Sequence, residues 1–449
     1  MRITMIGTGY VGLVSGVCFS EFGFDVTCVD KDQAKIEALQ RGEVPIYEPG
    51  LAELMVKNAG RLTFTTDLAG AVENADVIFI AVGTPTRRGD GEADLSYVYA
   101  AAREVGEAMR SGSVVVIKST VVVGTCREVR RIIEETAPDK EFSVASNPEF
   151  LREGAAIEDF LRPDRVVVGV EDAHGEQTLK ALYRPLNLRQ TPIVFTSLEN
   201  AEITKYAANA FLAMKISFIN EIADLCEIVG GNVQDIARGI GLDNRIGPKF
   251  LHPGPGYGGS CFPKDTRALA ATARRLGSPI RLVETTIAVN EERMRSIPER
   301  VIAAHGGSVE GKTIAVLGIA FKPNTDDIRE APSLTAIPAL QSAGATIRAH
   351  DPQAAEAAKP LLPGVTWCAS PYAAAESADG LVIMTEWNEY RALNLATLSR
   401  TMRGNVLVDL RNIYPPEEVA PHAFNYHSVG RKPRPAEPQS PARPRLVSS

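Results

Sequence analysis

The sequence has no C-x-x-C pair, although six cysteines are spread along its 449 residues. Their spacing does not resemble a disulfide framework, which is typical of small secreted domains. No stretch approaches the roughly 20 uninterrupted apolar residues that are needed to span a bilayer. We therefore expect a cytoplasmic protein with no membrane partner.

The N-terminus also lacks the marks of a secretory signal. Residues 1–22 are mostly apolar, but four glycines interrupt them, and no small-residue cleavage site follows. We therefore expect this segment to remain as part of a folded domain.

Positive charge is not in excess either. The formal net charge of -7 gives no general attraction to nucleic acid, so any anionic partner is expected to be small. A length of 449 residues, of which 45% are hydrophobic, allows two or three domains.

Short β-branched runs alternate with helical stretches along most of the chain, which is the pattern of an α/β fold. The sequence KTIAVLGIA at 312–320 resembles the opening RITMIGTGY, so we expect two similar, doubly wound, Rossmann-like domains. The expected buried strands are 2–6, 26–30, 77–82, 114–118, 143–146, 313–318, 345–350, 381–385 and 405–409.

A long helix without proline is expected to join the two domains. It covers 198–229, and further helices are expected to end near Arg274 and to cover 282–304, around a Gly/Pro-rich loop at 247–263. The polar, Pro-rich C-terminus is expected to be disordered. The expected divisions of the chain are 1–197, 198–304, 305–430 and 431–449.

A G-x-G-x-x-G motif follows the first expected strand, with glycines at Gly7, Gly9 and Gly12. Such glycines allow a tight turn and a close approach of the backbone to a pyrophosphate at a helix N-terminus. Because the motif alone is weak, a turn that only packs helix on strand is the alternative. Asp30 ends the second strand, where a carboxylate binds ribose hydroxyls and repels a 2′-phosphate. The pattern favours NAD, while Lys31 and Lys35 leave NADP open.

Three further loops follow strands of the first domain, at the edge where an open parallel sheet binds ligands. Thr84 and Thr120 lie in two of them, and ordinary turn chemistry explains either one taken alone. The third, SNPEFLREG, carries Glu149 and Glu153. If this segment begins a helix, the two carboxylates share a face, and their repulsion suggests a ligand or proton-transfer role.

Lys205 and Asn209 are four residues apart on the long helix and so point the same way. Most such pairs have no function, and their interest depends on the loop that follows.

That loop runs from Phe250 to Asp265 and is too rich in glycine and proline for a helix or strand. Tertiary contacts or a ligand must hold it. Pro263 suits the first position of a helix, which puts Cys261 just outside a helix N-terminus. The helix dipole and Lys264 would favour the reactive thiolate. The alternative, a small buried hydrophobe, is accepted for the other cysteines, which are Cys18, Cys28, Cys126, Cys226 and Cys368.

With these residues assembled, the chain resembles the UDP-glucose 6-dehydrogenase family, within the wider group of UDP-sugar and GDP-sugar dehydrogenases. The similarity runs from Met1 to about Arg431. The matching motifs are MIGTGYVGLVSGVCF, VGTPT, SNPEFLREG, KYAANAFLAMKISFINE, PGYGGSCFPKD and GIAFKPNTDDIRE.

The resemblance implies a four-electron oxidation of a sugar C6 hydroxymethyl group to a carboxylate with two NAD, and it implies no metal. Cys261 would capture the aldehyde as a thiohemiacetal, which becomes a thioester that water releases. Lys205 and Asp265 match residues around the reacting oxygen, and Asn209 would hold the oxyanion. Glu149 matches the base of hydrolysis, acting with Thr120.

The same matching assigns the binding residues. The cofactor would contact Gly7, Gly9, Val11, Gly12, Asp30, Lys35, Thr84, Thr120, Glu153, Lys264 and Arg329. UDP-glucose would contact Glu149, Phe150, Leu151, Arg152, Glu153, Lys205, Asn209, Arg245, Phe250, Leu251, His252, Pro253, Gly254, Gly258 and Lys322.

The resemblance also bears on assembly and on substrate choice. Arg245 resembles an arginine that reaches the substrate of a neighbouring subunit, which implies a homodimer or a higher oligomer. His252 and Pro253 depart from the family, where asparagine and a small residue are commoner. The alternatives are the same chemistry on UDP-N-acetylmannosamine or GDP-mannose, a one-step hydroxyacid dehydrogenase, and a non-enzymatic NAD-responsive protein.

Overall fold

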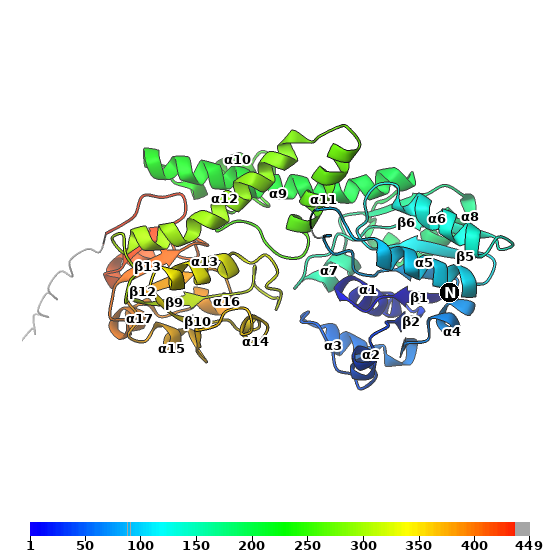
Figure 1. Ribbon diagram of the computed structural model, residues 1–449, viewed down its shortest axis with the longest axis horizontal. Helices are drawn as coiled ribbons and strands as arrows, with labels where there is room; N and C mark the ends of the chain where they lie inside the picture. Colours follow the sequence, from blue (N-terminus) through cyan, green and yellow to red (C-terminus); the bar gives the residue numbers. More distant parts are fainter. Residues whose placement is uncertain (88, 90, 436–449) are drawn as a thin grey trace, which may run out of the picture. The chain divides into compact units, whose positions relative to one another are not determined.

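A computed structural model describes residues 1–87, 89 and 91–435 and divides the chain into two compact units. The first unit comprises Met1–Phe211 and Lys264–Glu284, and the second comprises Leu212–Pro263 and the chain from Thr285 onward. Each unit has its own sheet (Figure 1).

The sheet of the first unit has the order β3-β2-β1-β4-β5-β6-β7-β8, and only the β6–β7 pair is antiparallel. Its strands are β1 (Arg2–Ile6), β2 (Asp25–Val29), β3 (Leu62–Thr65), β4 (Val77–Ile80), β5 (Ser113–Ile117), β6 (Phe142–Ser146), β7 (Val166–Val170) and β8 (Ile193–Thr196). The helices between these strands are α1 (Tyr10–Glu21), α2 (Gln33–Gln40), α3 (Leu51–Lys57), α4 (Leu68–Glu73), α5 (Ser96–Ala108), α6 (Thr125–Thr136), α7 (Ala156–Leu161) and α8 (Ala173–Leu182).

Alternate residues of these strands enter two separate hydrophobic cores, because successive side chains of a strand point to opposite faces. Met5 and Phe79 join the core that contains residues of α1, α3 and α7. Ile78 and Ile80 join the core that contains residues of α4, α5 and α6. Burial on both faces explains the continuous apolar runs in the sequence.

The sheet of the second unit is parallel throughout, with the order β11-β10-β9-β12-β13-β14. Its strands are β9 (Thr313–Leu317), β10 (Thr346–His350), β11 (Thr366–Trp367), β12 (Gly380–Ile383), β13 (Val406–Asp409) and β14 (Asn425–Ser428). Its helices include α10 (Val233–Gly241), α13 (Pro332–Ser342), α14 (Ala355–Ala358), α15 (Pro371–Ala375), α16 (Asn388–Arg391), α17 (Leu395–Thr401) and α18 (Pro416–Val419).

Three helices lie in the part of the sequence between the strands of the first sheet and those of the second: α9 (Leu198–Val229), α11 (Phe262–Arg275) and α12 (Arg281–Ala304). The expected helix at 198–229 therefore matches α9. No helix among the described residues is long and apolar enough to cross a membrane.

Two expectations about element boundaries need correction. The expected strand 77–82 ends at Ile80, because its last two residues belong to a loop at the carboxyl edge of the sheet. The expected disordered tail does not begin at Arg431. Arg431 donates from Nε to Asn232 at 3.0 Å, and Arg434 exchanges two backbone hydrogen bonds with Tyr426. The remainder of that tail, 436–449, lies outside the described residues.

Candidate active site

The turn between β1 and α1 uses its glycines for two different purposes. A Cβ on Gly7, which has φ +99°, would lie 2.6 Å from the Ala81 carbonyl oxygen, and one on Gly12 would lie 1.9 Å from the Gly7 oxygen. The fold itself therefore requires these two glycines. Gly9 has φ -70°, and its Cβ would meet nothing within 4 Å. Gly9 thus leaves open space at the start of α1, the position at which dinucleotide-binding turns hold a phosphate group.

Asp30 lies directly after β2 and faces the same turn. Its Oδ2 accepts hydrogen bonds from the Thr8 amide at 2.9 Å and the Thr8 hydroxyl at 2.7 Å, with Lys35 Nζ 3.3 Å away. Burial opposes ionisation of Asp30, but the hydrogen bonds from Thr8 and the Asp32 amide, together with the charge of Lys35, outweigh it and hold the Asp30 pKa below the ordinary value. An ionised carboxylate therefore stands where a dinucleotide-binding domain contacts ribose.

The loops after β4 and β5 meet each other. The Thr84 hydroxyl donates to the Thr120 carbonyl oxygen at 2.9 Å, and the Ser119 hydroxyl donates to the Val82 oxygen at 2.7 Å. The structure thus brings together two threonines that the sequence singled out separately.

Glu149 and Lys205 form a buried ion pair. Lys205 Nζ lies 3.0 Å from Glu149 Oε1, and the side chains are 4% and 5% exposed, respectively. Desolvation opposes the charge on Glu149, but Lys205 and the Leu151 amide hold its pKa below the ordinary value. Lys205 Nζ also lies 5.3 Å from the centre of the Phe150 ring.

The expected helix that would align Glu149 with Glu153 is wrong, because α7 begins only at Ala156. Glu48 explains the late start: its carboxylate accepts hydrogen bonds from the Gly154 and Ala156 amides, each at 2.7 Å. The two glutamates therefore share no helix face, and repulsion between them is no longer an argument for function. In the same segment, Arg152 forms an ion pair with Asp159 at 2.6 Å.

Asp265 is the central residue of a second group of hydrogen-bonded polar side chains in the first unit. Its carboxylate is buried and accepts hydrogen bonds from Asn209 Nδ2 and Lys264 Nζ, each at 2.6 Å. Lys205 and Asn209 therefore project from one face of α9 onto two different carboxylates, Glu149 and Asp265.

Cys261 is half-buried and stands immediately before the first turn of α11, with its Sγ 3.4 Å from the Ser260 hydroxyl. Pro263 is the second residue of that helix rather than the first. The glycine loop with Cys261 belongs to the second unit, whereas Lys264 and Asp265 open a segment of the first.

Cys368 packs against the core of the second unit, as expected of a small hydrophobe, but it is only half-buried. Its Sγ lies 3.7 Å from the Thr366 carbonyl oxygen. The other four cysteines are buried.

Within the second unit, the glycine loop packs closely on the segment after β9. A Cβ on Gly258 would lie 2.2 Å from the Glu330 carbonyl oxygen, and the Gly259 amide donates to Arg329 O at 2.8 Å. Gly254 faces Arg411, whose Nη1 would be 3.4 Å from an added Cβ. Gly258 leaves no room for a side chain, whereas at Gly254 a methyl group would make only ordinary van der Waals contact.

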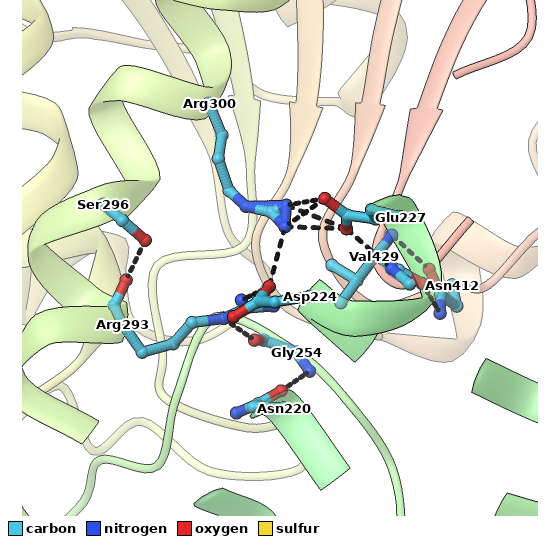
Figure 2. A network of polar contacts seen from close by, with 10 residues as sticks. Asn220, Asp224, Glu227, Gly254, Arg293, Ser296, Arg300, Asn412 and Val429 are labelled. Atoms are coloured by element: carbon cyan, nitrogen blue, oxygen red, sulfur yellow. Dashed lines mark hydrogen bonds and ion pairs between the residues drawn. The ribbon is translucent and has the colours of Figure 1, made fainter. Parts of the chain in front are cut away.

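Polar side chains of α9 and α12 hold the same loop (Figure 2). The Gly254 amide donates to Asn220 at 2.8 Å, and the Gly254 oxygen accepts from Arg293 Nε at 3.0 Å. Arg293 also pairs with Asp224. Asn290 exchanges two hydrogen bonds with the Tyr257 backbone, at 2.8 and 3.0 Å. These are the tertiary contacts that the loop composition requires.

Figure 2 also shows Arg300 bridging Asp224 at 3.2 Å and Glu227 at 2.7 Å. Sequence reasoning missed this network. The available signal was charge spacing, since acids at Asp224 and Glu227 on one helix match arginines at Arg293 and Arg300 on another.

The remaining predicted binding residues have varied surroundings. Phe250 has φ +65°, which is uncommon for an aromatic residue, and its ring lies 6.0 Å from that of Phe262. Leu251 is buried in the core. The Arg245 side chain is 89% exposed and pairs with Asp243 at 2.6 Å. Arg329 pairs with Asp327 at 2.8 Å.

Other predicted residues are placed by their loops and helices. Val11 lies in the first turn of α1 and is half-buried, Pro253 is buried and His252 is exposed. Lys322 follows β9, with its Nζ 5.2 Å from the Phe321 ring.

Two further side chains were not predicted from the sequence. Lys118 directly follows β5 as the only charged residue of SVVVIK and is buried. Arg411, in the loop after β13, donates to Met384 O at 2.7 Å and to Phe321 O at 2.8 Å. A charge directly after an apolar strand was the signal for Lys118.

Comparison with known proteins agrees with this architecture. Family models for UDP-glucose/GDP-mannose dehydrogenases match the chain in three parts: the NAD binding domain at 1–187, the central domain at 199–292 and the UDP binding domain at 315–416. The chain is 61% identical to UDP-glucose 6-dehydrogenase of Rhizobium meliloti, over 96% of this chain and 100% of that protein.

More distant relatives point the same way. A UDP-glucose 6-dehydrogenase of Bacillus subtilis is 48% identical, over 96% of this chain and 93% of the relative. A solved UDP-glucose dehydrogenase from Pyrobaculum islandicum has a TM-score of 0.88 at 40% identity, over 96% of this chain and 98% of that one. The chain therefore belongs to the UDP-glucose/GDP-mannose dehydrogenase family of NAD-dependent oxidoreductases.

Proposed function

We propose that this protein oxidises UDP-glucose to UDP-glucuronate with two molecules of NAD. The observation that carries the proposal is the 61% identity to the Rhizobium meliloti UDP-glucose 6-dehydrogenase. The local geometry supports it, because two buried polar groups and a half-buried cysteine supply the residue types that the chemistry needs.

The first unit is suited to NAD. Gly9 leaves room for a pyrophosphate, and the ionised Asp30 would accept hydrogen bonds from ribose hydroxyls. When bound, NAD supplies the hydride acceptor for both oxidations. Thr84 and Thr120 would contact it from the neighbouring loops. The other proposed cofactor contacts are Val11, Lys35, Glu153, Lys264 and Arg329.

Lys205 and Asp265 would manage protons and charge at the sugar C6 oxygen. As the alcohol is oxidised, Lys205 stabilises the developing oxyanion and Asp265 orients a water molecule that takes up the proton. The Cys261 thiolate then forms a carbon–sulfur bond to the aldehyde, giving a thiohemiacetal whose oxyanion Asn209 holds. Loss of a second hydride from this carbon leaves a thioester.

Hydrolysis completes the reaction. Glu149, assisted by Thr120, would take a proton from water as the water oxygen attacks the thioester carbonyl. The carbon–sulfur bond breaks, Cys261 is regenerated, and the sugar leaves as a carboxylate. Each turnover thus consumes one water and releases two hydrides.

The second unit would hold the nucleotide part of the substrate. Lys322 and the amides near Gly254 and Gly258 would neutralise the diphosphate. The other proposed sugar-nucleotide contacts are Phe150, Leu151, Arg152, Phe250, Leu251, His252 and Pro253.

We also propose that the active species is at least a homodimer. Phe218 and Leu225, seven residues apart on α9, are 49% and 54% exposed, and Leu242 is 78% exposed. Such an apolar surface favours contact with a second copy. The exposed Arg245 would then reach the substrate of the partner subunit. Mixing inactive Arg245→Ala and Cys261→Ser enzymes should restore activity, because a mixed dimer has one complete site.

A reducing compartment, which we take to be the cytoplasm, accords with the cysteines. Four of the six cysteines are buried.

A stoichiometric assay tests the proposed reaction. UDP-glucose should yield two NADH per molecule consumed, whereas GDP-mannose and UDP-N-acetylmannosamine should yield little. Cys261→Ser should bind NAD normally and lose net production of acid. One NADH per sugar, or unchanged turnover of Cys261→Ser, would refute the covalent route.

A further inference from the structure

Lys118 is a buried cation that the proposed mechanism leaves without a role. It follows β5 and is only 3% exposed. Its Nζ lies 5.8 Å from the ring centres of both Phe79 and Phe160. Among the described residues, no carboxylate oxygen lies within 4 Å of it. Keeping a lysine in such a place is costly unless its charge interacts with something nearby.

Its hydrogen-bond partner is Asn147, at the same edge of the sheet. Ile117 and Ser146 are register partners on β5 and β6, so the residues that follow them lie side by side. Lys118 Nζ donates to Asn147 Oδ1 at 3.2 Å, and the Tyr183 hydroxyl donates to the same oxygen at 2.5 Å. Asn147 in turn donates to Val167 O at 2.8 Å and opens the loop that carries Glu149.

The charges around Lys118 come from three elements. Glu149 on the loop after β6 attracts its ammonium, Lys205 on α9 repels it, and the Cys18 thiol on α1 contributes weakly. Burial lowers the pKa of Lys118 to about 8, against the attraction of Glu149. Lys118 therefore carries its charge below about pH 8. Glu149 then interacts with two cations: Lys205 is in direct contact, and Lys118 acts through its charge without forming an ion pair.

We infer that Lys118 is a positioning residue for Glu149, holding the Asn147 loop in place and keeping the Glu149 carboxylate ionised through its buried charge. The inference rests on the proposed function, in which Glu149 is the base of thioester hydrolysis. Lys205 is occupied at the reacting oxygen during turnover, so a second cation outside the substrate site would maintain Glu149 as a base.

Lys118→Met tests the charge, and Tyr183→Phe is the matched control. Tyr183→Phe removes the other hydrogen bond to Asn147 but keeps the Lys118 charge. Removing a nearby cation raises a carboxyl pKa, so the acid limb of kcat against pH should move up by about one pH unit in Lys118→Met. The profile of Tyr183→Phe should keep the wild-type midpoint. The Lys118→Met and wild-type curves should converge at pH values where Glu149 is fully ionised in both proteins.

Two further readouts keep the outcomes distinct. The thioester should accumulate in Lys118→Met at low pH, visible by intact-protein mass after an acid quench. The carboxyl ¹³C signal of Glu149 in the cofactor-free protein, assigned with Glu149→Gln, reports the same midpoint without turnover. Equal midpoints in wild type and Lys118→Met would overturn the inference. A wild-type enzyme that is inactive on UDP-glucose would refute the proposed function instead, and the ¹³C titration would still decide the role of Lys118. Lys118→Gln repeats the measurement if the methionine variant does not fold.

Discussion

The turn after β1 and the turn after β9 share the backbone conformation of their first glycine but differ in the residues that follow it. Gly7 has φ +99° and donates to Val29 O at 2.7 Å, and Gly318 has φ +92° and donates to His350 O at 2.9 Å. The surrounding strand order is also the same, with β3-β2-β1-β4-β5 in one sheet and β11-β10-β9-β12-β13 in the other.

The two turns differ in sequence at the second and third glycine positions of the motif. Where the first has Gly9 and Gly12, the second has Ala320 and Pro323. In the first unit, α1 begins at once, so its N-terminal amides face the turn. In the second unit, α13 begins only at Pro332. The second turn therefore lacks the helix N-terminus that binds a pyrophosphate.

The carboxylates after β2 and β10 also differ, in how far the protein itself occupies them with hydrogen bonds. Asp351 occupies the place of Asp30, but it is buried and accepts five hydrogen bonds. Its donors are the amides of Ile319, Ala320, Gln353 and Ala354 and the indole of Trp387. The protein itself saturates Asp351, whereas Asp30 keeps exposed surface for a ligand. The repeated fold thus uses Asp351 for its own stability and leaves Asp30 available for the proposed contact with NAD.

The largest expected effect comes from Gly12→Ala. Its Cβ would lie 1.9 Å from a backbone oxygen that cannot move without breaking the turn. We expect a loss of at least about 4 kcal/mol in the free energy of unfolding, together with loss of NAD binding. Pro323→Ala, at the matching position, should cost less than about 1 kcal/mol. Urea unfolding measures both, and a stable Gly12→Ala protein would contradict the comparison.

Exchanging each aspartate for asparagine should have the next largest effect, with opposite consequences. Asp351→Asn turns an NH₂ group toward buried donors, so we expect a loss of about 3 kcal/mol in stability and unchanged affinity for NAD. Asp30→Asn should lower NAD affinity at least about tenfold and change stability by less than about 1 kcal/mol. Calorimetric NAD titration and urea unfolding of both variants test this, and weaker NAD binding by Asp351→Asn would be contrary to it.

Local patterns were enough to predict the central strands of the two sheets and α9. The apolar runs of β1, β4 and β9 are continuous because both faces are buried, and α9 is long and free of proline. The edge strands β3, β8, β11 and β14 are less apolar, and they were missed. The interior strand β7 was missed as well, although it is apolar and buried.

The site could be predicted only where its residues are close together in the sequence. The spacing of Lys205 and Asn209 indicated one helix face, but not that they bind Glu149 and Asp265. Those partners depend on how α9 packs against distant loops. The start of α7 depends on Glu48, more than 100 residues before it, so the helix expected from Glu149 could not be corrected locally.

The smallest expected effect is that of Gly9→Ala, which should change NAD affinity but not stability. Gly9→Ala adds a methyl group to a turn whose φ of -70° suits alanine, at a place where no protein atom lies within 4 Å. The free protein should therefore unfold at the wild-type urea concentration. A pyrophosphate at the start of α1 would meet that methyl group, so NAD affinity should fall about tenfold, equivalent to about 1.4 kcal/mol. The reverse change, Ala320→Gly, should give the second unit no affinity for NAD, because α13 begins too far from its turn. An unchanged NAD affinity in Gly9→Ala would mean that the space above Gly9 is not where the dinucleotide binds.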